Sequence, residues 1–226
     1  MYQAWDSRIN RYVRFIHPIK TAGTSISQWM EDTYVDVIEW PHQQWINVPA
    51  PEDNTFTFTV FRNPWDRLES IYLELGRVVN DLSIVDARYG VTNTDYLERR
   101  ITPRFNSEDW HKGFEYFVDI IQDESQQSRL EHTLPEGIVF RAHTSQLSHW
   151  PTDWPVHVLR FDNVSNDWND MWKQFGITEK SLPHSKNYPH PESLHTARTR
   201  SVVEKIWEDD VSYFVSSRQD LYPIEK

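Results

Sequence analysis

Short runs of aromatic and β-branched residues alternate along this chain with longer segments whose apolar residues recur at helical spacing. The strand-like runs are residues 11–17, 34–40, 56–61 and 156–161. The helix-like segments are residues 26–30, 68–75, 114–121, 168–175 and 202–207. Strands that alternate with helices build a mainly parallel sheet flanked by helices. The order of these segments therefore predicts an α/β fold.

The length of 226 residues and the absence of an internal repeat predict a single domain over residues 1–226. Residues 79–112 are polar and weakly patterned, and we expect them to form an insertion or a lid over a binding site. No apolar run approaches the roughly 18–20 residues that a membrane-spanning helix needs.

Composition excludes several functional classes. The chain has no cysteine, so it cannot use disulfides, thiolate catalysis or cysteine-bound metals. A formal net charge of −11 disfavours binding to nucleic acid, although residues 1–30 carry an excess of positive charge that could attract a small anion. The first residues lack the design of a secretory signal, and we expect a cytoplasmic protein.

The first motif with chemical meaning is Phe-Ile-His-Pro-Ile-Lys-Thr-Ala-Gly-Thr-Ser at residues 15–25. It joins a predicted strand to a predicted helix, where free N–H groups and the helix dipole favour an anion. Ala22 and Gly23 allow close approach to the backbone, and Lys20 adds charge. The alternative is an ordinary turn in which Thr and Ser cap the helix. A Walker A loop is excluded because Lys20 precedes Gly23.

The second motif is Phe-Arg-Asn-Pro-Trp-Asp-Arg-Leu-Glu-Ser-Ile-Tyr at residues 61–72. Arg62 ends a predicted strand, and Pro64 suits the first position of the following helix. Ser70 lies off the apolar stripe of that helix, so Arg62 and Ser70 could together hold a phosphate. The alternative is a surface arginine in a salt bridge and a serine that faces water.

Together the two motifs resemble those of the sulfotransferase superfamily, and most closely the carbohydrate (Golgi-type) sulfotransferases and their bacterial relatives. Residues 15–25 look like the 5′-phosphosulfate loop, and residues 61–72 look like the 3′-phosphate motif. The family usually reads His-Ile-Pro-Lys, whereas Pro18 and Ile19 are exchanged here. The resemblance continues through residues 159–184 and 195–214, but residues 79–140 match poorly, as expected for an acceptor-specificity insertion or lid.

The resemblance implies a P-loop-like fold and transfer of a sulfuryl group from 3′-phosphoadenosine 5′-phosphosulfate (PAPS) to a hydroxyl acceptor, most simply a carbohydrate, without a metal ion. It implies that Lys20 contacts the phosphosulfate and steadies the leaving phosphate. The residues implied to cradle the phosphosulfate are Thr21, Ala22, Gly23, Thr24 and Ser25. Those implied to hold the 3′-phosphate are Arg62, Ser70 and, more weakly, Lys186.

His42 lies where the relatives carry a histidine that acts as the catalytic base, and imidazole titrates near neutral pH. His17 and Glu39 are alternative bases. Two other functions remain open at this point. One is a P-loop-type nucleotide phosphotransferase, which the position of Lys20 disfavours. The other is a non-catalytic glycan-binding or nucleotide-binding module, which the combination of Lys20, Arg62 and Ser70 disfavours.

Overall fold

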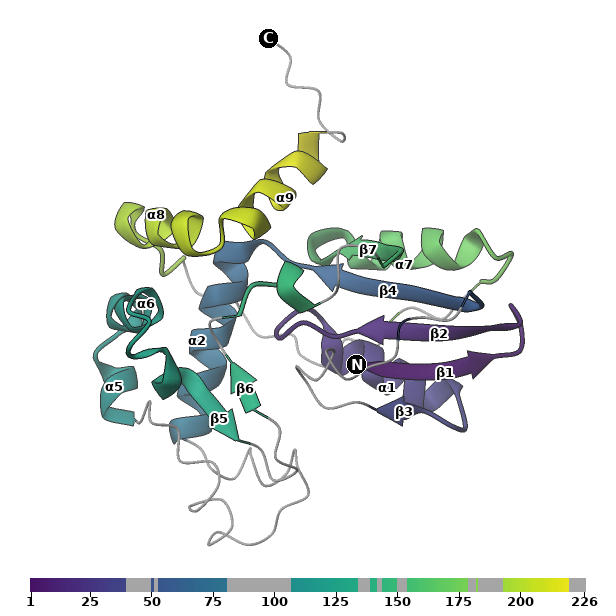
Figure 1. Cartoon of the computed structure of the whole chain (residues 1–226), viewed down its shortest axis with the longest axis horizontal. Coiled ribbons are helices and arrows are strands. Elements are labelled where there is room, and N and C mark those ends of the chain that lie inside the picture. Colours follow the sequence, from purple (N-terminus) through teal and green to yellow (C-terminus); the bar gives the residue numbers. More distant parts are fainter. Residues whose placement is uncertain are drawn as a thin grey trace, which may run out of the picture. The chain divides into compact units, whose positions relative to one another are not determined.

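The computed structural model describes residues 1–39, 50, 53–80, 107–133, 139–141, 144–149, 154–178, 182 and 193–219 (Figure 1). The chain forms two compact units. The first comprises Met1–Arg62 and Gln146–His190, and the second comprises Asn63–Ser145 and Pro191–Lys226. That these units act as the single domain expected over residues 1–226 stays a prediction.

A five-stranded sheet forms the centre of the first unit (Figure 1). Its strands lie in the order β3 (Ile38–Glu39), β1 (Tyr2–Asp6), β2 (Arg11–Ile16), β4 (Thr55–Phe61) and β7 (Val156–Arg160). The strands β2, β4 and β7 are parallel to one another, whereas β1 is antiparallel to both β2 and β3. The α/β fold is therefore confirmed, and four of the five strands of this sheet point the same way, with β1 alone reversed.

The N-terminal hairpin explains the reversed direction of β1. Strands β1 and β2 are joined by a four-residue turn, and a connection this short can join only antiparallel strands. In that turn Asn10 has a φ of 53°, a left-handed conformation that asparagine tolerates better than most residues. The sequence of β1 contains no β-branched residue, so composition alone does not predict it. Of the strand predicted over residues 34–40, only Ile38–Glu39 is a strand among the described residues.

One face of the sheet carries the main apolar core. Helices α1 (Gly23–Thr33) and α7 (Val164–Lys173) both pack there, against apolar side chains of β1, β2 and β4. Trp29 of α1 meets Trp168 of α7 edge-on, with ring centroids 4.7 Å apart. Trp168 and Trp172 are fully buried, as expected for core residues. Aromatic pairs of this kind stabilise a core by about 0.5–1.5 kcal/mol beyond their buried area, so this pair helps to hold α1 against α7.

The opposite face of the sheet carries polar side chains that are also buried. Arg14 and Thr57 are paired neighbours on β2 and β4, and each is only 2% exposed. Arg14 donates from Nε to Oε1 of Gln3 over 2.7 Å, and its guanidinium lies 5.5 Å from the ring of Trp154. Thr57 Oγ1 has no hydrogen-bond partner in the part of the chain that the structure describes. An unsatisfied buried hydroxyl costs about 1–3 kcal/mol, so Thr57 weakens this face.

The second unit is mainly helical (Figure 1). Its helices are α2 (Pro64–Asn80), α5 (Ser107–His111), α6 (Phe114–Gln122), α8 (Ala197–Ile206) and α9 (Glu208–Gln219). A short 3₁₀ helix, η2 (Gln127–Leu130), precedes an antiparallel pair of strands, β5 (Glu131–Thr133) and β6 (Val139–Arg141). The predicted apolar stripe of α2 is buried, and its members are Leu68, Ile71, Tyr72 and Leu75.

The helices predicted from apolar spacing are confirmed, and their ends have identifiable causes. Gly176 follows α7 with a φ of 72°, which glycine adopts without strain. Further along the chain, Thr196 and Thr199 form a capping box at the start of α8. Within the proposed insertion, residues 107–133 form α5, α6, η2 and β5, and a role as a lid stays a prediction. Among the described helices, none is long and apolar enough to cross a membrane.

Candidate functional site

The loop between β2 and α1 has an unusual backbone. Lys20 and Ala22 have φ values of 65° and 64°. Non-glycine residues adopt this left-handed conformation at a cost of about 1–3 kcal/mol each, and such residues cluster at ligand sites. Alternation of left-handed and right-handed residues can turn successive N–H groups toward one side, where they bind anions. The conformation of this loop therefore suits the presentation of backbone N–H groups to an anion.

The first turn of α1 supplies further donors. Ala22 is the N-cap residue, and no side chain caps the helix. The N–H groups of Ser25 and Ile26 donate to the carbonyl of Ala22. Those of Gly23 and Thr24 precede the first helical acceptor, so they have no partner within the helix. Together with the helix dipole, they make this turn at the carboxyl end of β2 suited to an anion, and binding of an anion there stays a prediction.

Other residues brace the loop from inside. Thr21 is fully buried, and its Oγ1 donates to the carbonyl of Pro18 over 2.7 Å. Ile19 is only 3% exposed, so the exchanged order of Pro18 and Ile19 places an apolar side chain in the interior. Thr24 is exposed and Ser25 is half-buried. Of the loop hydroxyls, those of Thr24 and Ser25 are therefore the accessible ones.

His17 packs against the start of α1. Its ring stacks on Phe15 with centroids 5.4 Å apart and lies 6.2 Å from the ring of Tyr2. On the other side it faces Gly23 so closely that a Cβ atom on that residue would lie 1.4 Å from Nε2 of His17. This packing favours a loop-shaping role for His17 over its alternative role as a base.

Arg62 contacts the same loop. Its side chain is buried, and Nη1 donates to the carbonyl of Lys20 over 3.2 Å. The guanidinium also lies over the ring of Phe161, 4.3 Å from its centroid. The structure thus brings Arg62 and Lys20 together, as expected for two residues at the carboxyl ends of neighbouring parallel strands.

Two partners of Arg62 are not expected from the sequence. Gln146 is fully buried and accepts from the N–H of Arg62 over 2.9 Å, and its Nε2 donates to the carbonyl of Arg62 over 2.7 Å. Phe161 begins the short 3₁₀ helix η4 (Phe161–Asn163) directly after β7. Phe161 falls within a strand-like run, which signals burial but not contact with an arginine. Gln146 lies outside every periodic segment, so no sequence pattern points to it.

Ser70 belongs to α2 in the second unit and is half-buried. Its joint role with Arg62 stays a prediction. The neighbouring Glu69 is buried and accepts from Ser193 Oγ and from the N–H of Leu194, each over 2.7 Å. His195 Nε2 lies 3.9 Å from Glu69 Oε1 and donates to the carbonyl of Trp65 over 3.0 Å. These bonds tie the segment before α8 to α2.

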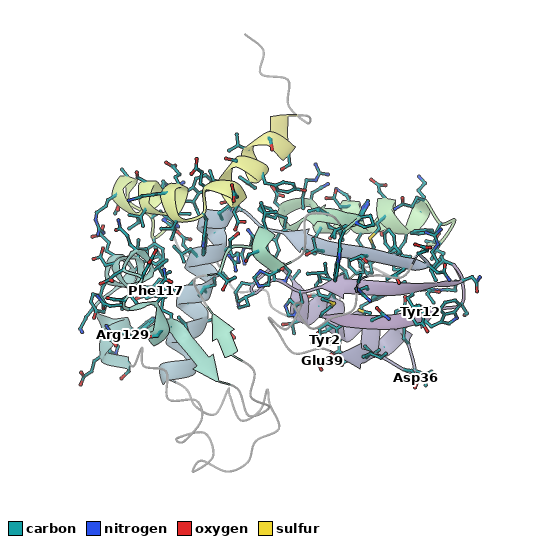
Figure 2. All side chains as sticks on the ribbon, viewed as in Figure 1. Tyr2, Tyr12, Asp36, Glu39, Phe117 and Arg129 are labelled. Carbon is teal, nitrogen blue, oxygen red and sulfur yellow. The ribbon has the colours of Figure 1, made fainter. Side chains whose placement is uncertain are left out.

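The predicted base His42 and the predicted phosphate ligand Lys186 lie outside the described residues. Glu39, an alternative base, ends β3 and is exposed. Tyr2 donates from its hydroxyl to Oε1 of Glu39 over 2.9 Å, and Figure 2 shows the two side by side. Burial raises the pKa of Tyr2, and the carboxylate of Glu39 raises it further. Because Tyr2 pairs with Phe15, Glu39 lies at the end of the sheet from which the Lys20 loop leaves.

A depression of about 390 Å³ lies at the other end of β1, and it contains none of the predicted site residues. Figure 2 shows Asp36, one of its lining residues, on the side away from Tyr2. Its buried Asp6 accepts from Arg8 Nη2 over 2.6 Å and from the hydroxyl of Tyr34 over 2.8 Å. Burial alone would raise the pKa of Asp6, but these bonds outweigh it and lower the pKa. The carboxylate is thus engaged in holding the hairpin turn to the end of α1.

Comparison with known protein families gives a match over most of the chain. The model of the sulfotransferase family matches residues 17–224, which begins at the strand–loop–helix junction and runs almost to the end of the chain. Neither a search of curated proteins nor a search of solved structures returned a match. A match over most of the chain shows the family: this chain belongs to the sulfotransferase family.

Proposed function

We propose that the protein transfers a sulfuryl group from PAPS to a hydroxyl group of a carbohydrate acceptor. The observation that carries the proposal is the Lys20 loop, in which a left-handed backbone precedes a helix whose first N–H groups have no side-chain cap. In a member of the sulfotransferase family, such a loop suits the phosphosulfate end of the donor.

The donor would be held at both of its charged ends. The backbone N–H groups of residues 21–24 and the hydroxyls of Thr24 and Ser25 suit the 5′-phosphosulfate. Arg62, Ser70 and Lys186 would hold the 3′-phosphate, since guanidinium, hydroxyl and ammonium groups all donate to phosphate oxygens. Arg62 is already bonded to the carbonyl of Lys20, so it would reach the phosphate with donors other than the Nη1 hydrogen used there.

In the transfer, a new bond forms between the acceptor oxygen and sulfur while the bond from sulfur to the phosphate oxygen breaks. His42 would act as the general base and take the proton of the acceptor hydroxyl. General-base catalysis raises the rate about 10²–10⁴-fold. Lys20 would stabilise the negative charge that develops on the leaving phosphate. The proposal requires no metal ion.

The choice of donor can be tested by thermal shift. Adenosine 3′,5′-bisphosphate, the product left after transfer, should raise the melting temperature of the protein, whereas ATP with Mg²⁺ should have little effect. Stabilisation by ATP with Mg²⁺ alone would contradict the proposal and favour a phosphotransferase. Release of the bisphosphate from PAPS in the presence of a panel of oligosaccharides would then identify the acceptor.

The base can be tested with two matched variants. His42→Ala should lower kcat by about 10²–10⁴ without changing the affinity for the bisphosphate, because a base contacts the acceptor and not the donor. Glu39→Gln should leave kcat nearly unchanged. The reverse result, with activity lost only in Glu39→Gln, would assign the base to the carboxylate that Tyr2 holds.

A further inference from the structure

We propose that Gln146 is a positioning residue of the donor site: it fixes Arg62, and through Arg62 it sets the backbone of the Lys20 loop. The identity of the ligand rests on the proposed function, but the contacts themselves do not. All of the residues concerned belong to the first unit.

The first step is the hold of Gln146 on the backbone of Arg62. The pairing of β4 with β7 ends at Phe61 and Arg160, so Arg62 is the first residue beyond the ladder. There the carboxamide of Gln146 offers one acceptor and one donor, as a neighbouring strand would, and it bonds both the N–H and the carbonyl of Arg62. Gln146 is fully buried, and a buried, satisfied network of this kind is rigid.

The second step leads from Arg62 to the loop. Nη1 of Arg62 donates to the carbonyl of Lys20, and the ring of Phe161 supports the guanidinium from one side. That carbonyl belongs to the peptide that links Lys20 to Thr21. In a trans peptide the carbonyl and the N–H point in opposite directions. By holding the carbonyl of Lys20, Arg62 therefore directs the N–H of Thr21 away from itself.

The consequence distinguishes Arg62 from a simple 3′-phosphate ligand. If it only bound the 3′-phosphate, its removal would not affect a nucleotide that lacks this group. In the chain of contacts from Gln146 through Arg62 to the carbonyl of Lys20, which we call the relay, Arg62 also maintains the left-handed conformation of Lys20. This conformation, with a φ of 65°, needs support from its surroundings. Loss of either Arg62 or Gln146 should then weaken binding of the 5′-phosphosulfate as well.

The test uses four variants of the full chain and two nucleotides. Gln146→Met keeps the length of the side chain but removes its hydrogen-bonding atoms, Arg62→Ala removes the guanidinium, and Phe161→Leu removes the supporting ring. Ser70→Ala is the control, because its hydroxyl is expected to contact only the 3′-phosphate. Calorimetry gives the Kd for adenosine 5′-phosphosulfate, which lacks a 3′-phosphate, and for adenosine 3′,5′-bisphosphate.

We expect Gln146→Met to raise the Kd of both nucleotides about tenfold, the size of one lost hydrogen bond to a positioned group. Arg62→Ala should also weaken the binding of both nucleotides, and that of the bisphosphate more strongly. Ser70→Ala should weaken only the bisphosphate. A merely structural Gln146 would lower the melting temperature or the binding stoichiometry and leave the Kd of the folded molecules unchanged, and that result would overturn the proposal.

Hydrogen exchange of the ligand-free protein separates this proposal from the proposed function. In Gln146→Met the amides of residues 19–24 should exchange several-fold faster than in the wild type, whichever ligand the site takes. Unchanged exchange would refute the relay. If neither nucleotide bound the wild type, the proposed donor would be wrong. The exchange rates in Gln146→Met would still show whether Gln146 positions the Lys20 loop. Should Gln146→Met fail to fold, Phe161→Leu tests the second step, because Phe161 is not fully buried.

Discussion

Replacing Gly23 with alanine should destabilise the protein, and this effect should disappear once His17 is also replaced. A Cβ atom on Gly23 would lie 1.4 Å from Nε2 of His17 and 2.0 Å from both Cδ2 and Cε1. Contacts this short cannot exist. The imidazole would therefore have to leave its place beside Phe15 and Tyr2.

Two opposing effects determine how much Gly23→Ala changes the free energy of unfolding. Displacing a packed ring costs about 1–3 kcal/mol, as other overpacked sites do. Gly23 lies in α1 and outside the left-handed region, so alanine gains about 0.5–1 kcal/mol there by losing less backbone entropy on folding. Gly23→Ala should thus lower the free energy of unfolding by roughly 1–2 kcal/mol. In the His17→Ala background, the same substitution should raise it by up to about 1 kcal/mol.

Urea denaturation of the wild type, the two single variants and the double variant measures both values. The coupling free energy between the two positions should be about 1–3 kcal/mol, within the range of residues in direct contact. Circular dichroism would establish that all four proteins retain their secondary structure. An equal cost of Gly23→Ala in both backgrounds would show that the ring of His17 does not occupy the space beside Gly23, and the reasoning would fail.

Three further predictions concern separate parts of the chain. Lys20→Ala should lower kcat by about 10²–10³ while circular dichroism and the melting temperature stay near those of the wild type, since Lys20 supplies charge and not packing. Thr57→Val should raise the free energy of unfolding by about 1 kcal/mol in urea denaturation, because valine has the same shape without the unsatisfied hydroxyl. Burial lowers the pKa of His195 below 6.5, so the unfolded chain binds its proton at a higher pH than the folded one, and stability falls as the pH drops below about 6.5. In His195→Gln this slope should be smaller but not absent, since burial lowers the pKa of His157 too.

The fold was predictable wherever a segment carries a strong period of its own. The apolar stripe of α2 and the tryptophans of α7 predicted both helices and the faces that they bury. The strand β1 was not predictable, because Tyr2–Asp6 has no β-branched residue and becomes a strand by pairing with β2 across a short turn. A tertiary contact thus decided what local propensity could not.

The site divides along the same line. The positions of Lys20 and Arg62 followed from the motifs, because each lies where a parallel strand ends and the chain turns. Their direct bond did not follow, since it depends on the left-handed backbone of Lys20. The role of Gln146 could not be predicted for a different reason. A single buried glutamine that bonds a distant backbone produces no periodic pattern in its own segment.

The first unit is assembled from two stretches of sequence, and this has a consequence for the order of folding. The hairpin of β1 and β2 can form early, because its contacts are local, whereas the Lys20 loop that follows it is held by Arg62. The bonds between Arg62 and Gln146 close a loop of 84 residues, for which the chain loses roughly 4 kcal/mol in entropy. Until then β4 has an open edge, since its partner β7 lies beyond Gln146 in the chain. We expect the Lys20 loop, although encoded near the N-terminus, to be among the last parts of the molecule to reach its final conformation.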